Sequence, residues 1–425
     1  MPQVQRISLR RVWRACHRWI GVGLLMLLVP ISVSGALLVY HDELDALVNP
    51  TRWTVSGPQL ALSPAQYIAA ASTVVASNET VTGVRFPRSP GHPVVVLARQ
   101  QVDPDRGRRP RFFSIYLDPP TGKVLDKVDF RSSWVGFLHV FHENLTIPQY
   151  SGRQVVGWVG VGMLILSLTG IWLWWPRGGS LLSALRWRRA PYTSTNLHHM
   201  FGFWISIPLA IVSLTGIYLS FPQQARSLMS SVVPMQPQPP RAFAAAIVEK
   251  PTLTPDDALR LARAVEPGAQ PATLFLPTEP SRRPAAESRA ENREGAKGEG
   301  GKSRDGGKGR DGAARGRDAP SPSWRVQLRD SAGELITVTV DDPSSSVSRQ
   351  PDPLAGNRAA QWIRWIHDGS RGGPVWQFVV FLTGVLPVVF AFTGILMWWR
   401  GRRMRKKVKA SDARQDGQEH LVAAE

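Results

Sequence analysis

Histidine is the residue type in this sequence best suited to chemistry, and most of the nine histidines lie beside strongly apolar segments. Ionisable groups at membrane depth are costly and usually mark a pathway or a ligand site. A neutral imidazole is a common metal ligand and a frequent axial ligand of haem iron. Six histidines close to the ends of the apolar segments are therefore candidate ligands: His17, His41, His139, His142, His198 and His367.

Four uncharged apolar runs must position these histidines. A helix of about 20 apolar residues is long enough to cross the hydrocarbon core of a bilayer. The sequence therefore predicts four membrane-spanning helices, at residues 19–41, 154–176, 199–222 and 374–399.

The formal net charge is +19, and the placement of the positive residues indicates how these helices are oriented. Arginine and lysine are dense in the N-terminal segment 1–18, the short link 177–198 and the C-terminal segment 400–425. Short basic segments stay on the cytoplasmic side, so both termini should be cytoplasmic, and segments 42–153 and 223–373 should lie outside. No basic patch is interleaved with aromatic residues for base stacking, which argues against nucleic-acid binding.

The helices repeat in pairs. In the first and third helices a histidine is followed, at the same spacing, by a small hydroxyl residue and a glycine. The second and fourth end in Thr-Gly and a run rich in tryptophan, and each has a histidine outside its start. The dipeptides are Ser34-Gly35, Thr169-Gly170, Thr215-Gly216 and Thr393-Gly394. Glycine at these positions would let helices, or a flat ligand, approach closely.

This repeat pairs His17 with His198 and His142 with His367. If each pair holds one iron, two centres lie near opposite faces of the membrane and the protein can conduct electrons across it. The sequence has one cysteine and therefore no Cys-x-x-Cys-His attachment site, so any haem must be the non-covalent b type. His139 could replace His142 as ligand, support it, or contact a propionate, and His41 has no counterpart in the second half.

The outer segments also match each other. Helix starts at Ser63-Pro64 and Thr254-Pro255 precede alternating strands at 112–117 and 335–340. The predicted fold is an internally duplicated, all-α four-helix membrane bundle with two small α+β extracytoplasmic domains. Residues 278–320 are almost devoid of apolar side chains, which predicts a disordered insertion in the second domain.

The chain resembles the PepSY-associated transmembrane family of bacterial inner-membrane proteins. The resemblance covers nearly the whole chain and rests on several motifs together. These are His17-Arg18-Trp19-Ile20-Gly21, His41-Asp42-Glu43-Leu44-Asp45, His142-Glu143-Asn144-Leu145, the Thr169-Gly170 to Trp175-Pro176 run, and Tyr116-Leu117-Asp118-Pro119-Pro120-Thr121-Gly122. One departure is Ser344-Ser345, where the second domain lacks the Thr-Gly turn.

Members of this family include ferric-siderophore reductases with b haems in the helix bundle. The resemblance therefore implies an oxidoreductase of the inner membrane, with two haems b, that reduces a ferric siderophore on the periplasmic side for iron uptake. No flavodoxin or nicotinamide domain is present in the sequence, so a quinol or a cytoplasmic reductase is the expected electron donor. Two other functions stay open: a b-type electron-transfer subunit for another acceptor, and a haem-free PepSY regulatory or scaffold protein.

Overall fold

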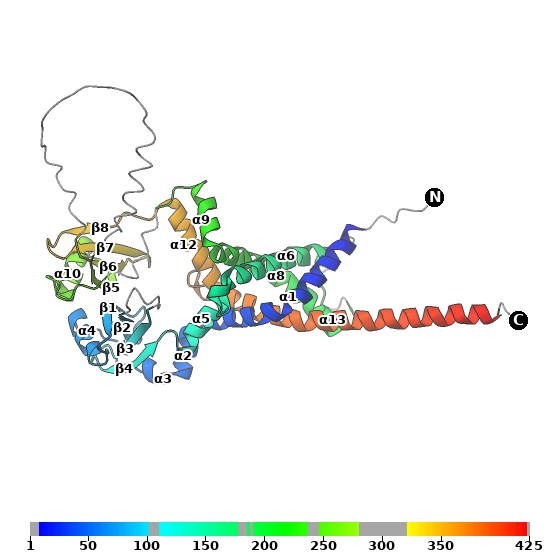
Figure 1. Cartoon of the computed structure of the whole chain (residues 1–425), viewed down its shortest axis with the longest axis horizontal. Helices are drawn as coiled ribbons and strands as arrows, with labels where there is room; N and C mark the ends of the chain where they lie inside the picture. Colours follow the sequence, from blue (N-terminus) through cyan, green and yellow to red (C-terminus); the bar gives the residue numbers. More distant parts are fainter. Residues whose placement is uncertain are drawn as a thin grey trace, which may run out of the picture. The chain divides into compact units, whose positions relative to one another are not determined.

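The computed structural model describes residues 8–101, 110–176, 185–187, 190–236, 246–279 and 321–422 (Figure 1). The chain forms two compact units that alternate along the sequence. Unit 1 comprises residues 1–47, 133–236 and 353–425, and unit 2 comprises residues 48–132 and 237–352. The predicted insertion at 278–320 lies outside the described residues, except for its first two positions.

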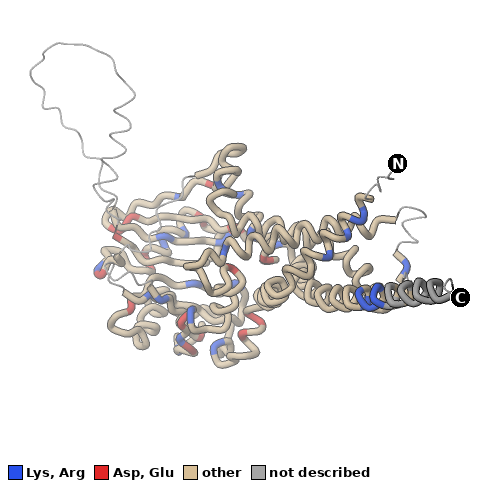
Figure 2. The backbone as a smooth tube through the Cα atoms, turned by 45° about the vertical axis from the view of Figure 1, so that its right-hand side comes forward, with Lys and Arg blue, Asp and Glu red and all other residues tan. Residues whose placement is uncertain are grey.

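Unit 1 is built on four helices that are long and apolar enough to cross a membrane. They are α1 (Leu9–Val39), α6 (Gly152–Trp174), α8 (Thr193–Ser220) and the first part of α13 (Gly373–Val422), up to Lys406. The contacts run α1–α13, α13–α8, α8–α6 and α6–α1, so each helix packs against two others. Lys and Arg gather where these helices approach the two termini (Figure 2). The protein is therefore a membrane protein, and α13 continues as a helix well past the predicted end of the span at residue 399.

Short helices adjoin these long ones. α2 (His41–Val48) follows α1, and α9 (Pro222–Ser230) follows α8. α5 (Trp134–Asn144) packs against α1 and α6, whereas α12 (Ala355–Asp368) packs against α8 and α13. The 3-10 turn η2 (Pro148–Tyr150) precedes α6, and the short helix α3 (Pro50–Trp53) belongs to unit 2.

Unit 2 contains a single antiparallel sheet of eight strands in the order β4-β3-β2-β1-β5-β6-β7-β8. The first half contributes β1 (Glu79–Arg85), β2 (Val94–Gln100), β3 (Phe112–Leu117) and β4 (Val124–Asp129). The second half contributes β5 (Gln270–Thr278), β6 (Ser323–Arg329), β7 (Leu335–Asp341) and β8 (Val347–Arg349). The predicted strands at 112–117 and 335–340 coincide with β3 and β7.

One helix from each half covers the same face of the sheet. α4 (Pro64–Ser72) contacts β1, β2 and β3, and α10 (Pro255–Val265) contacts β5 to β8. Both begin as predicted: Ser63 caps α4 in a full capping box with Gln66, and the Thr254 side chain accepts from Asp257 N. The Ala65 amide donates to Asp256 at 2.9 Å, which links the two helix starts.

The sequence predicts two separate domains, but the structure joins them through β1 and β5. Gly83, Val84 and Arg85 pair with Phe275, Leu274 and Thr273. Each of these strands would otherwise leave a row of unpaired backbone groups at an edge. The joined sheet also shares one core, in which Val84 and Val96 lie in the same cluster as Leu274 and Trp324.

Gly83 makes the junction possible. A Cβ atom at this position would lie 2.4 Å from the carbonyl oxygen of Leu274 and 3.1 Å from Cα of Phe275, both of them backbone atoms. The pairing of β1 with β2 is also irregular between Val81 and Gly83. Glycine within a strand commonly marks such a close backbone approach.

Replacing Gly83 with Val should therefore open the junction. We expect a loss of about 1–3 kcal/mol or more in stability, because neither backbone atom can move aside without breaking the β1–β5 pairing. Hydrogen exchange of the full-length chain should show faster exchange in β1 and β5. Gly268→Ala is the matched control, since a Cβ there meets nothing within 4 Å. Unchanged protection of β1 in Gly83→Val would contradict this account.

Two buried aspartates anchor the segments that lead into α4 and α10. Asp118 accepts hydrogen bonds from the amide and hydroxyl of Ser56, both at 2.7 Å, and from Thr121. Asp342 accepts from Thr252 N at 2.7 Å, Leu253 N at 3.1 Å and Trp324 Nε1 at 2.7 Å. Burial alone would raise the pKa of both carboxyl groups, but these hydrogen bonds outweigh burial and lower each pKa.

Stability contributed by Asp118 should therefore be present above the unfolded pKa of about 3.9 and be lost as the pH falls below it toward the lowered folded pKa. At pH 7, Asp118→Asn should cost about 1.5–3 kcal/mol, because charge-assisted hydrogen bonds are lost. Thermal unfolding of wild type and variant should converge as the pH falls through the lowered pKa of folded Asp118. Glu249→Gln, at an exposed position, is the control and should leave the midpoint unchanged. A pH-independent difference would contradict the assignment.

Candidate functional site: two pairs of histidines

The first histidine pair lies among the four long helices. His17 on α1 and His198 on α8 have ring centres 6.4 Å apart, with ring planes at 82°. The Nδ1 atom of His17 is 2.8 Å from the Thr169 hydroxyl on α6, and that of His198 is 2.9 Å from the Thr393 hydroxyl on α13. Each imidazole is thus tied to a helix other than its own.

The second pair joins the short helices α5 and α12. The ring centres of His142 and His367 are 6.3 Å apart, with planes at 43°. His142 Nδ1 lies 3.2 Å from the Ser34 hydroxyl and 3.0 Å from the Ile31 carbonyl on α1. His367 Nδ1 lies 3.1 Å from both the Thr215 hydroxyl and the Val212 carbonyl on α8. The pairing predicted from the sequence repeat is therefore the pairing found in space.

The hydrogen-bond network assigns the same tautomer to all four rings. The four hydroxyls each donate to a carbonyl of their own helix: Ser34 to Ile31, Thr169 to Ile165, Thr215 to Ile211 and Thr393 to Val389. A hydroxyl has one proton, so each can only accept from imidazole Nδ1, which must carry a hydrogen. The lone pair is left on Nε2. A second partner that fixes the tautomer in this way is typical of histidines that bind metals.

A glycine follows each hydroxyl residue and lies beside the ring. A Cβ at Gly35 would lie 2.8 Å from Cε1 of His142, and one at Gly216 would lie 3.0 Å from Cε1 of His367. The corresponding distances are 3.6 Å from Gly170 to His17 and 3.8 Å from Gly394 to His198, which are ordinary contact distances. Each hydroxyl therefore holds Nδ1 of one imidazole, and at the second pair the glycine also leaves space that the ring needs.

The spacing of the rings matches two imidazoles that share one metal ion. A metal–imidazole nitrogen bond is about 2.0–2.1 Å long, and the nitrogen is roughly 1.1 Å from its ring centre, which gives about 6.3 Å in total. Among the described residues no group of three or more His, Cys, Asp or Glu side chains is arranged to hold a metal ion. Each pair can therefore supply two ligands, and the other ligands would have to come from a bound group.

A comparison of the sequence with models of protein families identifies the family to which the chain belongs. The model of the PepSY-associated TM region matches residues 14–401, which is nearly the whole chain. The chain belongs to the PepSY-associated TM family. The resemblance inferred from the sequence motifs is thereby confirmed. A comparison with curated proteins finds no match.

The other two histidine candidates of this PepSY-associated TM protein lie together, one helical turn from His142 on α5. His41, at the start of α2, and His139 on α5 have ring centres 5.9 Å apart and meet edge to face. His41 Nδ1 bonds the Leu38 carbonyl at 2.8 Å, and its Nε2 is 3.3 Å from Asp42. The structure thus places His142, and not His139, opposite His367.

Buried arginine atoms are a further feature of the site that the motifs did not reveal. Arg18 directly follows His17, and Arg10 donates from Nη2 to the Leu173 carbonyl at 2.7 Å. The Nε atoms of both arginines are buried and have no hydrogen-bond partner among the residues that the structure describes. A buried guanidinium nitrogen without a partner is costly, so an acceptor at this place would be favoured.

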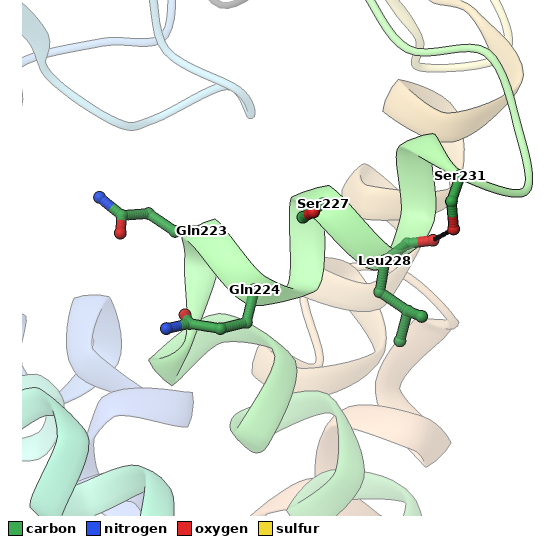
Figure 3. Close-up of a pocket in the computed structure, with 5 residues that line it drawn as sticks. All are labelled: Gln223, Gln224, Ser227, Leu228 and Ser231. Atoms are coloured by element: carbon green, nitrogen blue, oxygen red, sulfur yellow. Dashed lines mark hydrogen bonds between the residues drawn. The ribbon is translucent and has the colours of Figure 1, made fainter.

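An open surface hollow beside α9 carries no comparable chemistry. Gln223, Gln224, Ser227, Leu228 and Ser231 line it, and the glutamine side chains extend away from the helix (Figure 3). The Ser231 hydroxyl donates to the Leu228 carbonyl at 2.7 Å. These side chains hold amides and hydroxyls but no titratable group, and we assign the hollow no role.

The threonine hydroxyl should set the tautomer of His198. Thr393→Val removes the acceptor of Nδ1–H, so a population with the proton on Nε2 should appear in ¹⁵N histidine NMR spectra of the ligand-free, full-length chain. Ser34→Ala is the matched control, because His142 retains the Ile31 carbonyl as acceptor. If Ser34→Ala shifts its histidine as much as Thr393→Val does, the hydroxyls do not act as described.

Proposed function

We propose that this protein carries electrons across the bacterial inner membrane through two b-type haems and reduces ferric siderophores on the periplasmic side. The observation that carries the proposal is the geometry of the histidine pairs. His17 with His198, and His142 with His367, have ring spacings of 6.4 Å and 6.3 Å, as two axial ligands of one iron would. A transmembrane electron carrier needs such centres near both faces.

The donor set suits haem better than a bare metal ion. Each pair supplies two imidazole nitrogens, whereas structural zinc sites take four protein ligands. Haem supplies four equatorial nitrogens and, when bound, one-electron chemistry. His17 and His198 would hold one haem, and His142 and His367 would hold the other. Arg10 and Arg18, with buried nitrogens that have no partner among the described residues, would donate hydrogen bonds to the propionates of the group at the first pair.

The chain's own residues would tune this chemistry. The hydroxyls of Thr169 and Thr393 would hold the Nδ1–H tautomer at the first pair, and the backbone carbonyls of Ile31 and Val212 would do so at the second. Hydrogen bonds to the distal nitrogen raise the basicity of a metal-bound imidazole. The apolar helices around the pairs would exclude water.

The orientation follows from the placement of charge. Arg402, Arg403, Arg405 and Lys406 follow the apolar part of α13, and Arg10, Arg11 and Arg14 lie in the first turns of α1. By the positive-inside rule both termini are cytoplasmic. The first histidine pair then lies near the cytoplasm and the second near the periplasm. The matched hydrogen bonds of the two halves support an internal duplication of a four-helix bundle.

The reaction is a one-electron reduction of a bound metal. A quinol or a cytoplasmic reductase gives up electrons, and each Fe(III) in a chelate accepts one and becomes Fe(II). Hard oxygen donors hold Fe(II) less tightly than Fe(III), so the siderophore then releases its iron for uptake. The protein is thus an oxidoreductase whose substrate is iron in a chelate.

Haem content of the purified protein tests the proposal. The wild type, expressed with ample haem, should show a Soret band and about two haems per chain. His17→Ala or His198→Ala should remove one haem, and His142→Ala or His367→Ala the other, so each variant retains about one. His92→Ala is the control and should retain both. Pre-reduced protein should reoxidise on addition of a ferric siderophore.

Different failures of this experiment exclude different functions. The absence of a Soret band in the wild type would rule out both redox functions and favour the haem-free regulatory protein. Two haems with no reoxidation by ferric siderophores would indicate an electron-transfer subunit for another acceptor. Retention of both haems in all four histidine variants would show that the ligand pairs are wrong.

A further inference from the structure

The sheet of unit 2 has a second face, opposite the one that α4 and α10 cover. Side chains alternate along a strand, and Val84, Val96, Leu274, Val326 and Val338 all point into the core. The residues between them therefore point to the other face. We call this the arginine face and define it by six residues: Arg85, Arg99, Phe275, Arg325, Gln327 and Arg329.

The junction between the two half-sheets lies at the centre of the arginine face. Arg85 on β1 is paired with Thr273 on β5, and Thr273 is paired with Gln327 on β6. Two residues further along these strands, on the same face, Gly83 is paired with Phe275, and Phe275 is paired with Arg325. Arg85 and Arg325 therefore flank β5 from its two sides, and each comes from a different half of the chain.

The two flanking arginines are exposed and have no carboxylate partner among the described residues. The Arg325 guanidinium carbon lies 4.6 Å from the ring centre of Phe275, which holds it over the aromatic face. Asp126 on β4 pairs with Arg52 at 2.9 Å, and Asp341 on β7 accepts a hydrogen bond from Ser344 at 2.6 Å. The positive charges of Arg85 and Arg325 are therefore not paired with a carboxylate of the described strands.

Gly83 leaves the centre of the face without a side chain. Beside it lies the flat ring of Phe275, with an arginine to either side of β5. Guanidinium groups bind carboxylate oxygens in pairs of parallel hydrogen bonds, and an aromatic ring suits a planar ligand. Gln327 is partly exposed and can donate a further hydrogen bond.

We propose that the arginine face binds the substrate, and that the substrate is an anionic Fe(III) chelate of carboxylate or catecholate donors rather than a neutral hydroxamate chelate. This inference rests on the proposed function and specifies its substrate class. Arg85 and Arg325 hold the anion from opposite sides of β5, and Phe275 packs against its ring. The site exists only when β1 and β5 are joined.

Binding of redox-inert gallium(III) chelates to the full-length protein tests the proposal without requiring haem or reduction. Titration calorimetry should detect an anionic tricatecholate or citrate chelate of gallium, with affinity that falls as salt rises. The double variant Arg85→Gln, Arg325→Gln should bind about tenfold more weakly or worse, because charge-assisted hydrogen bonds are lost. Arg263→Gln, an exposed arginine on α10, is the matched control and should bind as the wild type does.

Three results would overturn the proposal: equal affinity of the double variant and the wild type, equal affinity for a neutral gallium trihydroxamate, or displacement of the chelate by inorganic phosphate at the same concentration. Each is distinguishable from failure of the proposed function, because a protein without a Soret band can still bind gallium chelates. Conversely, if the double variant carries two haems and reduces a chelate as efficiently as the wild type does, the proposed function stands and this binding site is ruled out.

Discussion

The hydrogen bond from an imidazole Nδ1–H to a hydroxyl on another helix is the interaction on which the site depends. It fixes the ring plane, determines which nitrogen keeps its lone pair, and ties together two helices that are distant in sequence. His17 is bound to Thr169 and His198 to Thr393, so the same contact occurs once in each half. The hydroxyl acts as the acceptor because its single proton is already donated to a carbonyl of its own helix. A buried donor without an acceptor would be costly.

The two pairs use this interaction differently. At the first pair the threonine hydroxyl is the acceptor, and the glycine beside it leaves ordinary contact distance to the ring. At the second pair a backbone carbonyl shares the role, and the glycines at 35 and 216 allow much closer approach. The second pair is also carried by α5 and α12, which are not among the four long apolar helices. The two histidine pairs are therefore held by different kinds of contact.

The sequence predicts the pairing of the histidines more completely than it predicts the fold of unit 2. Histidine spacing and the repeated dipeptides identified both pairs, because a duplicated helix preserves offsets that can be counted. The glycines of these dipeptides indicate close approach of a helix or a flat ligand, but the role of the hydroxyls is not predictable, since the direction of a hydroxyl hydrogen bond depends on a neighbouring helix that no local pattern specifies. His139 and His142 lie on one helical face, so only the three-dimensional arrangement distinguishes them. The β1–β5 junction escaped prediction because it pairs residues nearly 200 positions apart, and Gly83 looks like any other glycine in a strand.

The alternation of the two units along the chain has a consequence for biogenesis. The first half of the sheet is synthesised, and in the proposed topology exported, before the third and fourth apolar helices and β5 exist. Until β5 arrives, β1 exposes its backbone groups along a free edge, which invites pairing with other chains. The nascent protein thus passes through a stage that depends on protection from outside, and completion of the sheet must wait for the third apolar helix and the four strands that follow it to be made.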